Sequence, residues 1–287
     1  TVEIPSLTVD SVNRITPMRT DPGGKGINVS KVIDKLGGKS IAIGILGGDT
    51  GRSIQTALKR MGLETDFCFV EGETRTNMKV IDPVNHTNTD INEPGVTVSK
   101  EILDALLDDL LEKISEGDIV VISGSMPKGS PEDTYYVWTK ACREKGAKVI
   151  LDADGALFAT GVKASPYLVK PNNHELSRFA GRKLETVEEL EAEAKKMMQD
   201  YGIKKVVVSM GGDGALYVTE EKTIYAEGLK VPVGSTVGAG DSVVAALAFA
   251  EENGSSLEDT VRLSTATGGA NVMCSGTQAA EYEVIES

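Results

Sequence analysis

Three small residues and an aspartate stand directly before a long apolar run in Ser235–Ala250, STVGAGDSVVAALAFA. Gly238, Ala239 and Gly240 leave the backbone free to turn and to approach a ligand closely. Asp241 then falls in the first turn of a predicted helix, where free N–H groups suit phosphate oxygens and favour an ionised carboxylate. A general base that activates a hydroxyl for attack on a phosphoryl group needs such a carboxylate. A simple helix cap is the competing interpretation.

A second glycine cluster, DPGGKGIN at residues 21–28, opens another predicted helix. It is not a Walker A loop, because Gly26 stands where Ser or Thr must follow Lys25. It also lacks the G-x-G-x-x-G spacing and the preceding strand of a dinucleotide-binding site. The flexible backbone, the cation of Lys25 and the amide of Asn28 suit sugar hydroxyls and a phosphate. A glycine-rich turn with a solvated lysine is the alternative.

Two further segments offer contacts for a phosphorylated polyol. GETRTN, residues 72–77, places Arg75 in a strand-rich region, and arginine binds phosphate through a bidentate fork. SGSMPKG, residues 123–129, follows the strand-like IVVI and carries Ser125 and Lys128. It stands at the carboxyl end of a strand, where open α/β sheets bind ligands. An exposed arginine and an ordinary strand-to-helix loop explain the same residues without a ligand.

Two later loops suit a nucleotide and its metal. KPNNHEL, residues 170–176, presents Asn172 and Glu175, and Glu175 is a candidate to orient Mg²⁺ through water. An Asn and a Glu three residues apart are equally typical of a helix capping box. VSMGGDG, residues 208–214, offers Ser209 and three glycines after a strand for a phosphate or ribose, or forms a plain β-turn.

The elements that must position these residues alternate along the chain, which predicts an α/β fold with a parallel sheet covered on both faces. The predicted strands are continuous apolar runs at 41–46, 119–124, 148–154, 167–172 and 204–211. The predicted helices lie at 26–36, 52–60, 100–115, 132–145, 187–201 and 257–274.

Two segments, at about 1–16 and 66–92, break this rhythm. They alternate polar and apolar residues with no helix between strands, which predicts antiparallel pairing in a small separate sheet. Such a sheet needs a substrate or a second subunit to cover its bare face. The chain starts in what looks like the middle of a strand and without methionine, so we expect a first segment of the natural protein to precede Thr1.

The composition narrows the class of protein. The chain has 287 residues with 43 acidic and 30 basic side chains, a formal charge of -13 that argues against nucleic acid or an anionic membrane as main partner. No apolar run reaches the ~20 residues of a membrane span. Three cysteines without CxxC spacing and two histidines argue against a structural zinc site and fit a cytoplasmic protein.

The motifs GGKG-x-N, N-x-x-E, S-x-G-x-x-G and T-V-G-A-G-D occur in the order typical of the PfkB (ribokinase-like) carbohydrate kinases, and this resemblance covers essentially the whole chain. It implies a single domain, residues 1–287, with a three-layer α/β/α sandwich, a mostly parallel central sheet and a small β-sheet lid. Within the family, DPGGKGINVS, GETRTN, SGSMPKG and STVGAGDS look most like the kinases that act on fructose 1-phosphate. The implied reaction is transfer from Mg-ATP to the C6 hydroxyl, giving fructose 1,6-bisphosphate. Tagatose 6-phosphate and fructose 6-phosphate are the alternative acceptors.

The resemblance also implies roles for single residues. Asp241 takes the position of the general base, and the N–H groups of Gly238, Ala239 and Gly240 form the anion hole. The residues that match the substrate side are Gly23, Gly24, Lys25, Asn28, Arg75 and Ser125. Those that match the nucleotide side are Lys170, Asn172, Ser209, Gly211, Gly214, Thr236, Val237 and Asn271, with Glu175 linked to Mg²⁺ through water. In relatives the lid often forms a dimer interface, so a homodimer is expected.

Two departures from the family pattern stand out. The family's first strand carries an N-P-x-x-D segment whose aspartate binds sugar hydroxyls, and we expect this segment to lie before Thr1. The family's common D-T-T-G-A-G-D is replaced by Ser235, Thr236 and Val237 before the glycines, which puts one nucleotide contact in doubt. A non-catalytic sugar- or nucleotide-binding protein on the same fold is the alternative from another class. A dinucleotide-dependent oxidoreductase ranks low, because no G-x-G-x-x-G follows a first strand.

Overall fold

A central sheet of six strands forms the body of the molecule. The computed structural model describes residues 1–15 and 20–286, so the end of the expected lid segment at Thr16 lies outside the described residues. The strands follow the order β11-β10-β9-β8-β7-β6, with β6 to β9 parallel and the pairs β9–β10 and β10–β11 antiparallel. Their bounds are Ile119–Ser123 (β6), Lys148–Asp152 (β7), Leu168–Val169 (β8), Lys205–Ser209 (β9), Ala215–Thr219 (β10) and Thr223–Ala226 (β11). The mostly parallel sheet is confirmed.

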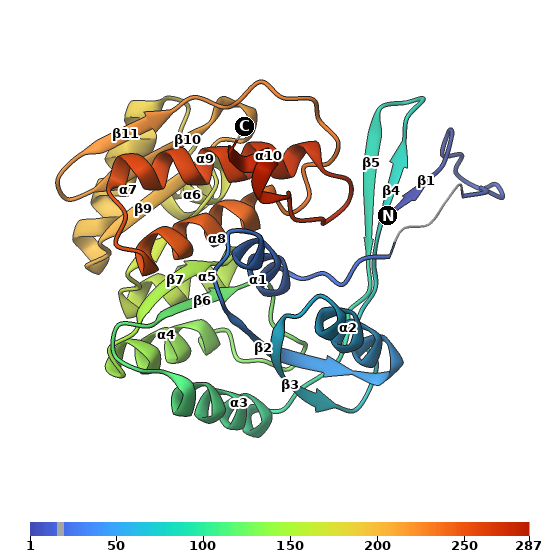
Figure 1. Cartoon of the computed structure of the whole chain (residues 1–287), viewed down its shortest axis with the longest axis horizontal. Helices are drawn as coiled ribbons and strands as arrows, with labels where there is room; N and C mark the ends of the chain where they lie inside the picture. The colour runs from blue at the N-terminus through green and yellow to red at the C-terminus, as the bar shows by residue number, and fades with distance from the viewer. Residues whose placement is uncertain (16–19, 287) are drawn as a thin grey trace.

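Helices cover both faces of this sheet, because successive strand residues point to opposite sides. In β7, Val149 and Leu151 pack into a core with α4 to α7, whereas Ile150 packs with α1, α8, α9 and α10 (Figure 1). The three-layer α/β/α sandwich is thereby confirmed. The helices are Lys25–Lys35 (α1), Gly48–Arg60 (α2), Lys100–Lys113 (α3), Thr134–Glu144 (α4), Gly155–Gly161 (α5), Asn173–Ala180 (α6), Val187–Tyr201 (α7), Ala239–Glu252 (α8), Leu257–Met273 (α9) and Tyr282–Glu286 (α10).

A small three-stranded sheet projects from this body (Figure 1). It contains Val2–Glu3 (β1), Asn77–Asp82 (β4) and Thr87–Asn92 (β5), in the order β1-β4-β5. The hairpin of β4 and β5 is antiparallel, as expected, but β1 runs parallel to β4. Antiparallel pairing of the first segment was therefore the wrong prediction. Whether two distant strands pair parallel or antiparallel depends on the path of the chain between them. The local alternation of polar and apolar residues does not encode that path.

The start of the expected lid segment 66–92 belongs elsewhere. Residues 66–70 lie in Glu64–Val70 (β3), which pairs in parallel with Ile41–Gly47 (β2) and not with the projecting sheet. The reason is that α2 separates the two strands, and a strand–helix–strand crossover makes parallel neighbours. Among the described strands, β2 and β6 each have one partner, and a cavity of about 750 Å³ lies between their free edges.

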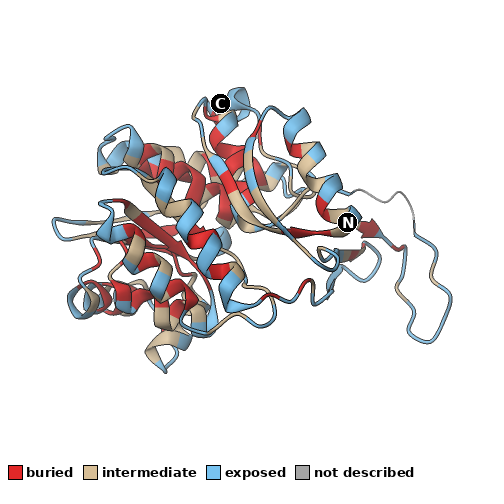
Figure 2. Ribbon diagram, turned by 90° about the horizontal axis from the view of Figure 1, so that it is seen from below, coloured by how far each residue is buried: buried red, intermediate tan, exposed pale blue. Residues whose placement is uncertain are grey.

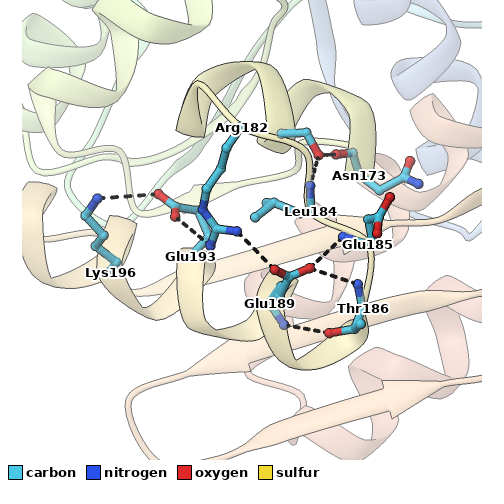
Figure 3. Close-up of polar contacts among 9 residues, drawn as sticks. Asn173, Arg182, Leu184, Glu185, Thr186, Glu189, Glu193 and Lys196 are labelled. Carbon is cyan, nitrogen blue, oxygen red and sulfur yellow. Dashed lines mark hydrogen bonds and ion pairs between the residues drawn. The ribbon is translucent and has the colours of Figure 1, made fainter.

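Local capping fixes the connection between α6 and α7 (Figure 3). Thr186 and Glu189 form a reciprocal capping box at the start of α7. The Arg182 guanidinium pairs with Glu189 at 3.1 Å, and its second nitrogen lies 3.9 Å from Glu193. Side chains thus satisfy N–H groups that a helix start leaves free.

Burial follows the layers (Figure 2). Buried residues fill the central strands and the inward faces of the helices, whereas every residue of β5 is exposed. Within residues 1–15 and 20–286, no helix has the length and apolar character needed to cross a membrane.

Candidate active site

Asp241 is a buried carboxylate in the first turn of α8. The N-cap position belongs to Gly238, and Asp241 is the third residue of the helix. Its Oδ2 accepts a hydrogen bond of 2.7 Å from Asn28 Nδ2, and the residue is 7% exposed. Burial raises the pKa of this carboxyl above its ordinary value, against the opposing hydrogen bond of Asn28. Its partner is thus a side chain of α1, so a simple N-cap does not describe Asp241.

The loop before α8 is held in a fixed shape. Gly238 has φ of 82°, a left-handed conformation that favours glycine. Its carbonyl accepts hydrogen bonds from the N–H and the Oγ of Ser242, at 2.8 and 2.9 Å. The N–H of Ala239 makes only a long 3.5 Å contact with Thr236 O. First-turn N–H groups have no acceptor within their own helix, so this loop offers donors to an anion.

Asn271 supports the same loop from α9. It is 3% exposed, and its Nδ2 donates to Val237 O at 3.3 Å. A Cβ on Gly238 would lie 3.5 Å from the same nitrogen. The structure therefore places Asn271 against the predicted anion hole, where it holds the backbone of Val237.

Lys25 and Asn28 bring the start of α1 to Asp241. Helix α1 begins after Gly24, whose φ of 122° favours glycine. Lys25 Nζ lies 3.1 Å from Asp152 Oδ2 at the end of β7. Burial disfavours the ammonium of Lys25, but the neighbouring carboxylates, Asp152 foremost and then Asp241 and Glu175, together raise its pKa.

Lys170 completes a cluster of alternating charges. It is 5% exposed, and its Nζ lies 3.4 Å from Asp152 Oδ1. A Cβ on Gly240 would lie 3.5 Å from the same Nζ, which places this cation beside the predicted anion hole. Two ammonium groups and two carboxylates, those of Asp152 and Asp241, therefore meet at the carboxyl ends of the parallel strands.

Arg75 reaches this region from the segment between β3 and β4. Its Nη2 donates to Ser125 Oγ at 2.7 Å, so two residues predicted on the substrate side meet. The loop of Ser125 also adjoins Lys25, because a Cβ on Gly124 would lie 3.8 Å from Lys25 Cβ. Arg75, Ser125 and Lys25 thus line one side of the site.

Asn172 and Glu175 form a capping box. Asn172 Oδ1 accepts from the N–H of Glu175, and Glu175 Oε2 accepts from the N–H of Asn172, both at 2.8 Å. The structure therefore confirms that this motif caps α6. Glu175 also contributes to raising the pKa of Lys25, so its charge acts on the cluster. In the described part of the chain, no three His, Cys, Asp or Glu side chains gather closely enough to hold a metal ion by themselves.

Ser209 and the glycines after β9 lie next to this box. Ser209 forms an isolated parallel bridge with Asn172. Gly211 begins a short 3-10 turn between β9 and β10, and Gly214 follows it. A Cβ on Gly214 would lie 2.0 Å from Ala226 O, so close backbone packing requires this glycine. The turn interpretation is realised here as well.

The sequence profile of the pfkB family of carbohydrate kinases matches residues 3–283. The chain belongs to this family. The pfkB kinase is 39% identical to 1-phosphofructokinase of Bacillus subtilis (strain 168) over 269 residues, 94% of this chain and 87% of that protein. It is 35% identical to 1-phosphofructokinase of Escherichia coli (strain K12) over 262 residues, 91% and 83% of the two chains. The predicted family is confirmed.

Solved structures agree with this membership. Phosphofructokinase-2 from Escherichia coli in complex with substrates and products matches with a TM-score of 0.94 and 31% identity, over 99% of this chain and 92% of that one. A possible 1-phosphofructokinase from Thermotoga maritima matches with a TM-score of 0.87 and 29% identity, over 99% and 92%. Ribokinase from Thermotoga maritima, at 23% identity, shares the fold with a TM-score of 0.78 over 99% and 93%.

Two residues of this candidate site were not predicted from the sequence. Asp152 ends an apolar strand, and its place at the carboxyl end of that strand is the one sequence signal that could have identified it. Lys31 stands one turn after Asn28 in α1 and donates to Asn28 Oδ1 at 3.4 Å, to Thr277 O at 3.4 Å and to Pro22 O. Asn28 thus accepts from Lys31 through Oδ1 while its Nδ2 donates to Asp241.

Proposed function

We propose that this chain transfers the terminal phosphoryl group of ATP to the C6 hydroxyl of D-fructose 1-phosphate, which gives D-fructose 1,6-bisphosphate and ADP. One observation carries the proposal: the buried carboxylate of Asp241 stands in the first turn of α8, directly after a loop that offers N–H donors. The activity named for the 1-phosphofructokinase relatives supports this choice of acceptor.

Asp241 would act as the general base. As the hydroxyl oxygen attacks the terminal phosphorus, its proton passes to the carboxylate of Asp241, and the bond from that phosphorus to the ADP oxygen breaks. The hydrogen bond from Asn28 at 2.7 Å orients the carboxylate. Its raised pKa makes it a better proton acceptor than an exposed aspartate, provided that it is ionised.

The N–H groups of Gly238, Ala239 and Gly240 would stabilise the negative charge on the transferring phosphoryl group. Lys170, beside Gly240, adds a cation there. Thr236 and Val237 shape the loop through the contacts with Ala239 and Asn271. Water exclusion strengthens these interactions, because charge is screened less in a buried site.

Lys25, Arg75 and Ser125 would bind the phosphate that the acceptor already carries. Arginine offers a planar pair of donors to phosphate, and lysine offers a point charge. Gly23 and Gly24 precede Lys25 in the same loop and let the backbone approach the sugar. A phosphorylated acceptor is favoured over a free sugar, because two cations line this side.

Mg²⁺ would lower the negative charge of the ATP phosphates and orient them. The residues present fit a magnesium ion that keeps most of its waters, since Glu175 has one oxygen in the capping box and a second that can accept from a bound water. Asn172 and Ser209 would line the nucleotide side beside it.

The homodimer through the lid and the cytoplasmic location stay predictions. Met78 and Ile91 lie opposite each other in the lid hairpin and are 40% and 56% exposed. Such an apolar pair gives a second subunit something to cover.

The acceptor can be tested by measuring ADP release with Mg-ATP and three phosphosugars, each offered alone and then in competition. We expect kcat/KM to be highest for fructose 1-phosphate, ahead of tagatose 6-phosphate and fructose 6-phosphate. A higher value for either competitor would move the proposal to that acceptor. Binding of these sugars without turnover would favour the non-catalytic alternative.

A further inference from the structure

The carboxylate of Asp152 connects the two halves of the site. It ends β7, which lies between β6 and β8 in the sheet, and it is 2% exposed. Its Oδ2 lies 3.1 Å from Lys25 Nζ, and its Oδ1 lies 3.4 Å from Lys170 Nζ. These two lysines come from the start of α1 and from the residue after β8.

In the proposed function, each lysine serves a different reactant. Lys25 belongs to the loop assigned above to the acceptor sugar. Lys170 lies beside Gly240, in the loop assigned to the transferring phosphoryl group. Two ammonium groups held this near to each other repel, and a buried cation without a partner tends to lose its proton. A carboxylate between them offsets this repulsion and fixes the positions of both ammonium groups.

We propose that Asp152 is a positioning residue that holds Lys25 and Lys170 on either side of the reacting groups, so that the acceptor phosphate and the donor phosphoryl group are bound in register. This role rests on the proposed function. Asp152 acts through the two lysines, and the proton transfer itself belongs to Asp241. Misplacement of reactants by about 1 Å costs on the order of 10²-fold in rate, so loss of the shared carboxylate has a large kinetic effect.

The test is Asp152→Asn, which keeps the shape of the side chain and removes its charge. We expect kcat/KM to fall by about 10²-fold, with a higher KM for the phosphosugar and a lower kcat. The matched control is Asp154→Asn, two residues along, where the carboxylate is exposed and pairs with Arg178 at 2.6 Å. That variant should retain the kinetics of the wild type. A purely structural role would instead lower the melting temperature and the active fraction while KM stays unchanged, and that result would overturn the proposal.

A double-mutant cycle with Lys25→Met checks that Asp152 acts through the lysine. If it does, Asp152→Asn costs less in the Lys25→Met background than in the wild type. Fully additive costs would contradict the positioning role. If the wild type is active and Asp152→Asn has the same kinetics, the role of Asp152 is refuted but the proposed function is not. A wild type that phosphorylates no sugar would refute the proposed function.

A measurement that does not depend on turnover tests the role of Asp152 even if the wild type phosphorylates no sugar. Lysines labelled with ¹³C by reductive methylation titrate in NMR spectra, and Lys25 should titrate at a lower pH in Asp152→Asn than in the wild type. The reason is that Asp152 is the anion nearest to Lys25 and stabilises its charged form most. Asp241 and Glu175 also face Lys25, and they remain in the variant. An unchanged titration of Lys25 would mean that Asp152 does not hold this ammonium in solution.

Discussion

Replacing Asp241 with asparagine is expected to lower kcat by about 10² to 10⁴-fold, the range that loss of a general base produces. Asparagine keeps the shape of the side chain but cannot take the hydroxyl proton. Binding of Mg-ATP and of the phosphosugar should persist, because the loop before α8 and the two lysines are unchanged. Steady-state ADP release gives kcat, and calorimetric titration gives the two affinities.

The matched control for this variant is Asp259→Asn. Asp259 is also the third residue of its helix, α9, where it accepts a hydrogen bond of 2.7 Å from the Ser256 hydroxyl, and its side chain is 63% exposed. It should change stability slightly and leave kcat as it is. If Asp241→Asn behaves like this control, the carboxylate of Asp241 is a helix-start group and not the base.

Removing the guanidinium of Arg75 is expected to raise KM for fructose 1-phosphate by about 10-fold or more. A hydrogen bond to a charged group contributes about 1.5–3 kcal/mol, and 1.4 kcal/mol corresponds to a factor of ten. The change in Arg75→Ala should be selective for phosphorylated acceptors and should leave KM for ATP near its wild-type value. Initial rates over a range of each substrate measure both constants.

Arg52→Ala serves as its control, since Arg52 lies on α2, is 64% exposed and pairs with Asp49 at 2.6 Å. It removes the same charge without removing a residue that meets Ser125. Equal KM changes in the two variants would point to the overall charge of the protein. An unchanged KM in Arg75→Ala would remove Arg75 from the phosphate site.

Much of the core was predictable because its signals are local. Continuous apolar runs and amphipathic periods define β6, β7, β9, α3 and α7, and alternation of strands with helices predicts parallel pairing. The direction of β1 and the partner of β3 depend on contacts between distant segments. Polar alternation near residues 66–70 therefore suggested the lid, although the preceding helix α2 directs β3 to β2.

The site divides in a similar way. The sequence singles out the glycines, Lys25, Asn28 and Asp241 as candidates, because their types and spacing are unusual before a helix. Asp152 was missed, since one aspartate at the end of a strand carries no spacing signal and its two lysine partners lie 127 and 18 residues away in the chain. Asn172 and Glu175 carry a spacing signal, but that signal is ambiguous. A capping box and a magnesium-linked pair need the same two residue types three positions apart.

In the proposed reaction, the phosphoryl group reaches the C6 oxygen of fructose 1-phosphate. The most direct measurement is ³¹P and ¹³C NMR of the products formed from fructose 1-phosphate and Mg-ATP by the wild-type chain. We expect equal amounts of ADP and fructose 1,6-bisphosphate, with the new phosphorus signal coupled to the C6 position. ADP accompanied by free phosphate, transfer to another hydroxyl, or no turnover at all would contradict it.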